Sequence, residues 1–245
     1  MNISEITVIV PTRNEEKNIA RFLASVPEAV ALIVADASDD RTVEILKRKR
    51  RGGLRVLRCY GNISQARQLG ADSARTPWLL FSDADVEFPP AYFARALGHA
   101  GDDVVYGPKL SRDSYISYYQ WFARTQRVSH SLGPPAASGS NLLVRREVLQ
   151  AVGGFDPELA CNEDSEFVWR AKRGGFRVAF DPALLVYARD HRRLHRGRWR
   201  KTAHSIIRCL MLYFDLLPSR WRRHDWGYWS PLESDADNRT GQRGE

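Results

Sequence analysis

The first half of the chain alternates short apolar segments with longer segments of mixed polarity. Four apolar, partly β-branched segments read as strands, at residues 6–10, 32–35, 54–57 and 78–82. The segments between them have helix-like patterns, at residues 15–26, 41–50 and 64–73. Strands that are apolar along their whole length are buried on both faces, as in parallel sheets with helices on either side. The pattern therefore predicts a doubly wound α/β fold.

The second half of the chain predicts a less regular arrangement. An aromatic helix is expected at residues 115–131, followed at 133–140 by small residues and prolines too dense for regular structure. We expect this loop to lie over the site and to be mobile. The further expected elements are a strand at 141–144, a helix to about 152, a helix at 164–173, and strands at 177–180 and 184–187.

Length and charge add a tail to this picture. The 245 residues fit one catalytic domain plus an appendage, and 43% hydrophobic with 27% charged residues is typical of a folded protein. Eleven Lys and Arg against two Asp between Arg189 and Arg223 account for the net charge of +8. Such a segment fits an anionic membrane or a phosphate-bearing ligand better than a nucleic-acid surface, although a solvated helical tail has the same composition.

Cysteines and apolar segments restrict the cellular setting. Cys59, Cys161 and Cys209 form no CxxC pair, so the sequence indicates neither a zinc site nor a disulfide framework. The N-terminus lacks the features of a secretory signal. The apolar segment at 206–217 is interrupted by Arg208 and Asp215 and falls short of the roughly 20 residues that span a bilayer. We expect a cytoplasmic protein, with peripheral contact to the inner face of the membrane as an option.

Acidic residues follow two of the predicted strands, where ligands bind in open α/β sheets. Asp83 and Asp85 leave the fourth strand and, two residues apart, point to the same side. Two carboxylates in a crevice favour a hard cation, Mg²⁺ or Mn²⁺, that takes its other ligands from water and a diphosphate. The alternative is a solvated acidic turn. Asp36 follows the second predicted strand and can accept hydrogen bonds from a ribose or a base, whereas Asp39 or Asp40 is placed to cap the next helix.

Two further clusters carry candidate chemistry. Glu163 and Asp164 open a helix, where acids are stabilised by exposed N–H groups, but one of them could instead be the general base for an acceptor hydroxyl. His191 follows the last predicted strand and is either a metal ligand or a surface residue. Arg192 and Arg193 have the geometry to balance a pyrophosphate leaving group.

Taken in order, these segments resemble the inverting GT-A glycosyltransferases of family 2, from about Ile6 to His191. The resemblance rests on Val8-Ile9-Val10-Pro11-Thr12-Arg13-Asn14-Glu15, Val34-Ala35-Asp36-Ala37-Ser38-Asp39-Asp40, Ala66-Arg67-Gln68-Leu69-Gly70, Asp83-Ala84-Asp85, Ser138-Gly139-Ser140-Asn141, Gly153-Gly154-Phe155-Asp156 and Glu163-Asp164. Ala35, Ala37, Gln68 and Val86 depart from the usual pattern, which leaves the donor's base and sugar open.

The resemblance implies a fold, a reaction and a set of roles. The fold would be GT-A, with a mixed, mostly parallel sheet flanked by helices. Asp164 would be the catalytic base, and Asp85 and His191 would bind Mn²⁺ or Mg²⁺. The donor-binding residues would be Pro11, Thr12, Arg13, Glu15, Asp36, Arg67, Asp83 and Ala84. The acceptor or pyrophosphate side would comprise Gly139, Ser140, Glu163, Arg192 and Arg193.

The implied reaction moves a sugar from a UDP- or GDP-sugar to an acceptor hydroxyl, with inversion. Residues 1–190 would form the catalytic domain, with about 1–110 binding the donor and 111–190 the acceptor. Residues 191–229 would form a basic, aromatic helical tail, and 230–245 would be disordered. The tail could pack on its own core, join a homodimer or contact a membrane. A membrane contact would favour a lipid-linked acceptor over a glycan or small molecule.

Other classes of function fit the sequence less well. A sugar nucleotidyltransferase needs a Gly-rich first loop, and residues 11–15 contain no Gly. An NAD-type oxidoreductase would carry GxGxxG after the first strand. A nucleic-acid-binding protein gives no role to the strand-end acids, which repel phosphate. A catalytically silent protein that binds a sugar nucleotide keeps the whole pattern, and only turnover separates it from a transferase.

Overall fold

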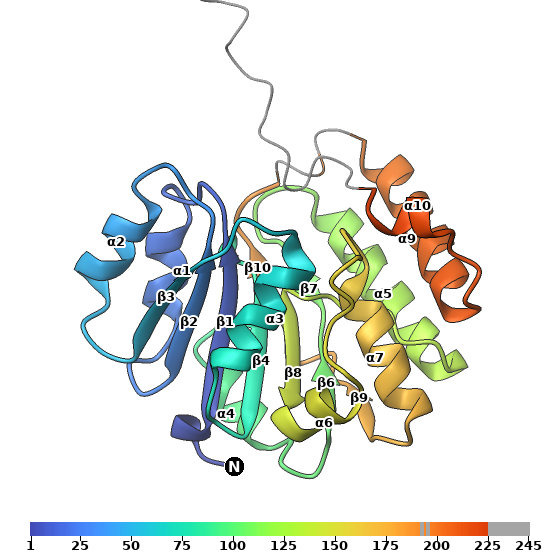
Figure 1. Cartoon of the computed structure of the whole chain (residues 1–245), viewed down its shortest axis with the longest axis horizontal. Coiled ribbons are helices and arrows are strands. Elements are labelled where there is room, and N and C mark those ends of the chain that lie inside the picture. Colours follow the sequence, from blue (N-terminus) through green and yellow to red (C-terminus); the bar gives the residue numbers. More distant parts are fainter. Residues whose placement is uncertain (192–193, 195–196, 225–245) are drawn as a thin grey trace, which may run out of the picture.

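The computed structural model describes residues 1–191, 194 and 197–224 and contains a central sheet with helices on both faces (Figure 1). The predicted pyrophosphate role of Arg192 and Arg193 and the predicted disorder of residues 230–245 fall outside these described residues. The predicted α/β class, with a mixed and mostly parallel sheet, is confirmed.

The central sheet has seven strands, and only β8 runs against the others. From one edge to the other, the strands are β3 (Leu54–Arg58), β2 (Ala31–Asp36), β1 (Ile6–Thr12), β4 (Trp78–Ser82), β8 (Asn141–Arg145), β6 (Val104–Tyr106) and β9 (Val178–Phe180). β1 pairs in parallel with both β2 and β4, so Thr12 lies beside Asp36 at the carboxyl ends of their strands. These carboxyl ends form the edge at which the predicted site residues gather.

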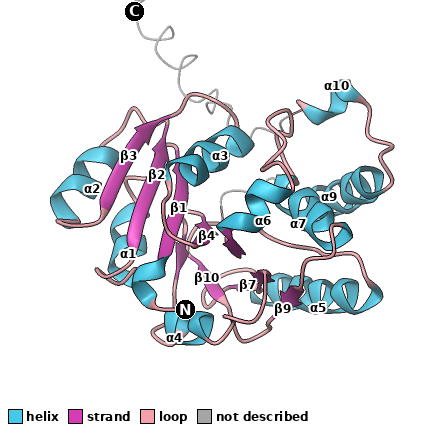
Figure 2. Ribbon diagram, turned by 60° about the horizontal axis from the view of Figure 1, so that its bottom comes forward, coloured by secondary structure: helices cyan, strands magenta, loops and turns pink. Residues whose placement is uncertain are grey.

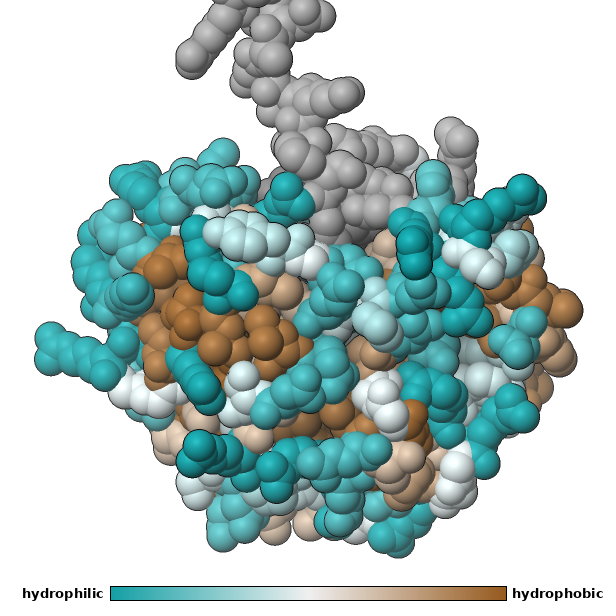
Figure 3. Space-filling view, in the orientation of Figure 1, coloured by the Kyte–Doolittle hydropathy of each residue, from teal (hydrophilic) through white to brown (hydrophobic). Residues whose placement is uncertain are grey.

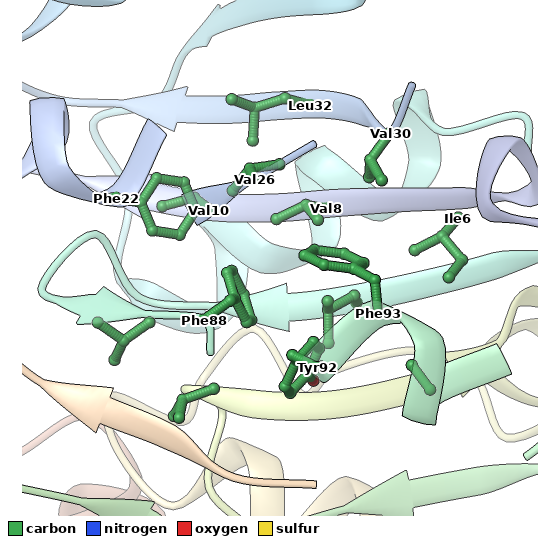
Figure 4. Close-up of a cluster of buried hydrophobic side chains, with 14 of the residues drawn as sticks. Ile6, Val8, Val10, Phe22, Val26, Val30, Leu32, Phe88, Tyr92 and Phe93 are labelled. Carbon is green, nitrogen blue, oxygen red and sulfur yellow. The ribbon is translucent and has the colours of Figure 1, made fainter. Parts of the chain in front are cut away.

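Both faces of the sheet are covered by helices. The helices are α1 (Ile19–Ser25), α2 (Thr42–Lys49), α3 (Ile63–Ser73), α4 (Tyr92–Leu97), α5 (Ile116–Leu132), α6 (Arg146–Ala151), α7 (Glu163–Arg173), α9 (Arg198–Tyr213) and α10 (Ser219–Arg222), with a 3-10 turn at Ile3–Glu5 (Figure 2). Successive strand residues pack into two separate cores. Val8 and Leu80 join the core beneath α1 and α4, shown in Figure 4, whereas Ile9 and Leu79 join the core beneath α3, α6 and α7.

This two-sided burial explains why the strands are apolar throughout. All seven residues of β1 and all five of β4 are buried. Each fully buried aliphatic side chain contributes roughly 1.5–3 kcal/mol of hydrophobic stabilisation, so a polar residue at most of these positions would cost stability. The prediction of a parallel sheet with helices on either side followed from this property.

Several short elements were not predicted. α4 and β6 belong to the main fold, while β5 (Val86–Glu87), β10 (Val186–Ala188) and β7 (Lys109–Leu110) form a separate three-stranded sheet. Strands of two or three residues contain too few positions to show an alternating pattern. The strand expected at 184–187 is β10, which lies in this small sheet and starts at Val186.

The prediction of a helix over residues 15–26 was wrong at its start, because α1 begins only at Ile19. Asn14 has a φ of 56°, in the left-handed region. The N–H of Glu15 donates to Thr42 Oγ1 at 2.9 Å, and that of Glu16 donates to Asp40 Oδ2 at 3.1 Å. These bonds to the neighbouring loop hold the segment outside the helix.

The N-cap residue of α2 is Arg41, so neither predicted candidate, Asp39 or Asp40, occupies that position. The Asp40 carboxylate nevertheless binds the start of the helix from the preceding residue. Its Oδ1 accepts a hydrogen bond from the backbone N–H of Thr42, the first residue of α2, at 2.9 Å. This satisfies one of the N–H groups that the first turn leaves without a partner.

The C-terminal helix α9 packs beside α7 and α5. Trp169 Nε1 in α7 donates to the Tyr213 carbonyl at 3.2 Å, and the rings of Trp121 in α5 and Trp199 in α9 are 5.1 Å apart. No helix in the described part of the chain is both long and apolar enough to cross a bilayer.

Candidate active site

A cavity of about 360 Å³ opens beyond the carboxyl end of β4. Its wall is built from the residues after β4, the irregular segment 133–140, the start of α7, and parts of α5 and α9. It brings together eight of the predicted site residues: Arg67, Asp83, Asp85, Gly139, Ser140, Glu163, Asp164 and His191. Residues separated by more than one hundred positions in the sequence therefore share one site.

Arg67 lies at the centre of the acidic part of this cavity. Its side chain, on α3, is only 2% exposed. One guanidinium nitrogen donates to Asp83 Oδ1 at 2.9 Å and another donates to Glu163 Oε1. Burial by itself would lower the pKa of Arg67, but the negative charges of Glu163, Asp83 and Asp164 outweigh burial and raise it. Arg67 therefore stays charged and joins the two acidic motifs.

Asp83 and Asp85 both face the cavity, as their spacing predicts. Asp83 Oδ2 accepts a hydrogen bond from Ser140 Oγ at 2.6 Å. Asp85 Oδ1 accepts one from Lys109 Nζ at 3.0 Å, and the Asp85 carbonyl accepts one from Arg189 N at 2.8 Å. The two carboxylates are thus fixed by different parts of the chain, although they leave the same strand.

Glu163 and Asp164 begin α7, directly after Asn162, whose φ of 64° turns the chain into the helix. Asp164 accepts hydrogen bonds from the backbone N–H of Gly139 and from that of Ser165, each at 2.6 Å. Burial raises the pKa of Glu163 to about 7, and it also raises the pKa of Asp164. Both acids therefore hold a proton more readily than exposed carboxyl groups do.

Gly139 lies so close to Arg67 that it has no room for a side chain. A Cβ built on Gly139 would come within 2.1 Å of the Arg67 guanidinium, far inside van der Waals contact. We expect Gly139→Ala to displace Arg67 and to lower the unfolding free energy by about 1–3 kcal/mol. Thermal unfolding measures this. Gly52→Ala is the control, because nothing lies within 4 Å of its Cβ position; equal melting temperatures for the two variants would contradict the prediction.

His191 lines the same cavity as Asp85, but both of its ring nitrogens have partners. Nδ1 lies 3.2 Å from the Tyr119 hydroxyl oxygen, and Nε2 lies 2.9 Å from Asp113 Oδ1. Hydrogen bonds from Ser111 and from His191 hold the pKa of Asp113 well below its ordinary value. Within the described residues, no group of three or more His, Cys, Asp or Glu side chains is arranged to hold a metal ion.

The predicted donor-binding residues before β3 do not line this cavity. Asp36 is fully buried and accepts hydrogen bonds from Thr12 Oγ1 at 2.7 Å and from Arg58 at 2.6 Å. Pro11, Arg13 and Glu15 lie in the adjoining segment. Ala84, also predicted on the donor side, packs in the core beneath α1 and α4.

The segment after β1, which carries the predicted donor-binding residues, is nevertheless tied to the cavity. Asn18 Nδ2 donates to Glu15 Oε2 at 2.7 Å and to Asp190 Oδ2 at 3.1 Å, and Asp190 is on the cavity wall. These contacts connect the segment after β1 to the region of His191.

The sequence model of glycosyl transferase family 2 matches residues 7–153. This chain belongs to glycosyl transferase family 2. The match covers the acids at Asp36, Asp83 and Asp85 and ends ahead of Glu163. The predicted family is therefore confirmed, while the roles of all the site residues, inside and outside the matched range, stay predictions.

Two curated proteins of similar sequence have named activities or pathways. The chain is 24% identical to the pre-mycofactocin glycosyltransferase of Mycobacterium tuberculosis, over 77% of this chain and 43% of that protein. It is 26% identical to the succinoglycan biosynthesis protein ExoA of Rhizobium meliloti, over 74% and 62%. The chain thus spans about half the length of the curated relatives it matches.

Solved glycosyltransferase structures confirm the GT-A fold. The mannosyltransferase PcManGT of Pyrobaculum calidifontis, in complex with GDP-Man and Mn²⁺, superimposes with a TM-score of 0.65 at 22% identity, covering 89% of this chain and 72% of that one. S. aureus TarS 1–349 with UDP-GlcNAc gives a TM-score of 0.61 at 18% identity, covering 96% and 77%. The fold is common to all three proteins.

Sequence reasoning missed several side chains that contact the predicted site residues. Arg58 ends β3 beside Asp36, and the rule that ligands gather at strand ends could have found it. Lys109 lies in a two-residue strand and Asp113 in an irregular segment, neither with a sequence signal. Their contacts with Asp85 and His191 depend on the folded chain.

Proposed function

We propose that this chain transfers a sugar from a UDP- or GDP-sugar to an acceptor hydroxyl, with inversion at the anomeric carbon. The observation that carries the proposal is the single cavity shared by the strand-end acids Asp83 and Asp85 and the helix-start acids Glu163 and Asp164. Membership of family 2 supports it, and so do related folds in complex with GDP-Man or UDP-GlcNAc.

The side chains of Asp85 and His191 offer ligand atoms that suit Mn²⁺ or Mg²⁺. A carboxylate oxygen and an imidazole nitrogen are ligands that Mn²⁺ accepts, and Mg²⁺ prefers the carboxylate. Both side chains are on the cavity wall, and His191 would exchange its contact with Asp113 for the ion. When bound, the ion would neutralise the charge that develops on the departing nucleoside diphosphate.

Asp164 is the proposed general base. Its two hydrogen bonds from the Gly139 and Ser165 N–H groups fix the carboxylate at the cavity wall. A base must be ionised and yet accept a proton as the acceptor oxygen attacks. The raised pKa of Asp164 increases its basicity, because burial penalises the charged form.

The donor would be positioned by side chains held by Arg67, Ser140 and Asp36. Arg67 and Ser140 hold Asp83 from two directions, which fixes its carboxylate for a donor hydroxyl. Asp36 is fully buried but holds Arg58, whose side chain is 51% exposed. We therefore propose that Asp36 acts on the nucleotide partly through Arg58.

Nucleotide binding tests this proposal before any acceptor is known. Thermal unfolding is followed with UDP, GDP, UDP-sugars and GDP-sugars, with and without Mn²⁺, because a ligand that binds only the native state raises the melting temperature. We expect one nucleotide class to stabilise the wild type in a metal-dependent way and to lose this effect in Asp85→Ala. Glu44→Ala, an exposed carboxylate on α2, is the control. No response to any nucleotide would contradict the proposal.

A further inference from the structure

Helix α9 has its apolar side facing outward. Ala203, Ile206, Ile207, Leu210 and Phe214 recur at steps of one, three or four positions, which places them on one side of a helix, and all are exposed. The opposite side carries buried residues, with the charged Arg208 among Thr202, Leu212 and Tyr213. A surface helix of a soluble domain normally has the reverse arrangement, with its apolar stripe toward the core.

Polar contacts fix the helix in this orientation. Arg208 is 1% exposed; its Nη1 donates to the Trp221 carbonyl at 2.5 Å and its Nη2 to the Cys161 carbonyl at 3.5 Å. Asn162 Nδ2, which precedes α7, donates to Ser205 Oγ at 2.6 Å. Rolling the helix over would break these bonds, so the outward position of the apolar side is determined by the fold.

We define the α9 apolar face as four exposed apolar residues of α9 and three that follow it, Phe214 and Leu216 directly after the helix and Trp221 in α10. The four on α9 are Ala203, Ile206, Ile207 and Leu210. The large side chains of this face are between 42% and 72% exposed. Figure 3 shows apolar side chains at the right-hand edge of the molecule, where Figure 1 places α9. Large exposed apolar side chains gathered on one side of a helix mark an interaction site more often than singly scattered ones do.

The charge beside this face identifies its partner. Exposed Arg220 and Arg223 lie on either side of Trp221, with Arg223 also paired to Glu158. The sequence from Arg189 to Arg223 has eleven basic residues against two acidic ones. Apolar residues with interfacial tryptophan and a basic rim are the features of helices that lie in the interface of anionic bilayers. We propose that the α9 apolar face docks this protein on an anionic lipid bilayer.

A second copy of the chain fits the same face less well. A two-fold symmetric dimer would place each α9 apolar face against its own equivalent. Arg220 and Arg223 beside each face would then lie near their equivalents, and like charges across an interface are unfavourable. An anionic membrane instead gains from every basic residue near its surface.

The docking surface is continuous with the cavity. Ile206 and Leu210 belong to the α9 apolar face and also line the cavity wall that carries Asp164. Docking would therefore place the cavity at the bilayer surface. This step rests on the proposed function: an acceptor hydroxyl on a lipid anchor could then reach Asp164 without leaving the membrane.

Co-sedimentation of the full chain with vesicles, in the absence of any sugar nucleotide, tests the docking. We expect binding to phosphatidylcholine vesicles that contain about one third phosphatidylglycerol and much weaker binding to pure phosphatidylcholine. Ile207→Gln/Phe214→Gln should lower the partition coefficient by about 100-fold, because each side chain contributes roughly a tenfold gain on burial. Neither residue lines the cavity, so nucleotide-induced thermal stabilisation should be unchanged.

Charge variants complete the test. Arg220→Glu should weaken binding to the anionic vesicles, whereas Arg48→Glu, the same change at an exposed arginine of α2, should not. Failure of the wild type to bind anionic vesicles would overturn the proposal. So would a dimer that dissociates in Ile207→Gln/Phe214→Gln, without vesicle binding. Because nucleotide binding is measured separately, loss of docking is distinguishable from failure of the proposed function.

Discussion

Asp164→Asn should lower the rate of sugar transfer by about 10²- to 10⁴-fold, the usual contribution of a general base. Asparagine keeps the shape of the side chain and can still accept a backbone N–H bond, but it cannot take the acceptor's proton. The nucleotide should therefore bind with unchanged affinity, and the loss should appear in kcat. Initial-rate kinetics at saturating donor, combined with a nucleotide-binding assay, separates the two effects.

Glu166→Gln provides the matched control for this prediction. Glu166 lies on the same helix as Asp164, and its substitution by Gln removes the same negative charge. Glu166 pairs with Arg170, however, and is not on the cavity wall. Its kcat should stay near that of the wild type. Burial raises the pKa of Asp164. On acidification, wild-type activity should therefore begin to fall at a higher pH than it would if the base were an exposed aspartate. A wild-type rate in Asp164→Asn would assign the base to another residue.

Arg67→Met should destabilise the protein more than any other single change in the cavity. It removes a cation that donates to both Asp83 and Glu163 while keeping a side chain of similar length. Breaking a buried pair leaves an uncompensated charge and costs about 3–5 kcal/mol, which corresponds to a fall in melting temperature of roughly 10 °C. Arg95→Met is the control: Arg95 also bonds a carboxylate through two nitrogens, but its side chain is 50% exposed, so a much smaller loss is expected.

The pH dependence of Arg67→Met follows from Glu163. In the native wild type, burial raises the pKa of Glu163 from 4.5 to about 7, so the native state binds more protons than the unfolded state between these pH values. This group therefore favours folding at low pH and loses its contribution as pH rises through 7. Without Arg67 the pKa of Glu163 rises further. The loss of unfolding free energy in Arg67→Met, relative to the wild type, should therefore be smaller at pH 5 than at pH 8. A deficit that grows on acidification would contradict this account.

The fold was predictable because its signals are local and repeated. Continuous apolar runs such as residues 78–82 predict buried parallel strands, and the strand-end rule placed Asp36, Asp83 and Asp85 at one edge of the sheet. The strand-end turns gave the family resemblance, which the match over residues 7–153 confirms. The start of α1 was not predictable, since contacts with Thr42 and Asp40 override helical propensity there.

The interior of the site was less accessible to sequence reasoning. Nothing local indicates that Gly139 packs on Arg67 or that Arg67 joins Asp83 to Glu163, because these partners meet only after folding. The apolar segment at 206–217 was visible in the sequence, but the side of α9 that faces outward was not. Arg208 is buried and donates to the carbonyl groups of Cys161 and Trp221. These contacts, which form only in the folded chain, leave the apolar side of the helix exposed.

The most direct test of the central claim is release of nucleoside diphosphate from a panel of UDP- and GDP-sugars, with Mn²⁺ or Mg²⁺ and with membrane lipid extract as the acceptor source. We predict that the wild type releases UDP or GDP from one donor class in a metal-dependent way, and that Asp85→Ala and Asp164→Asn release little. A wild type that binds a sugar nucleotide but releases no nucleoside diphosphate from any donor would contradict the transferase assignment and indicate a catalytically silent sugar-nucleotide-binding protein.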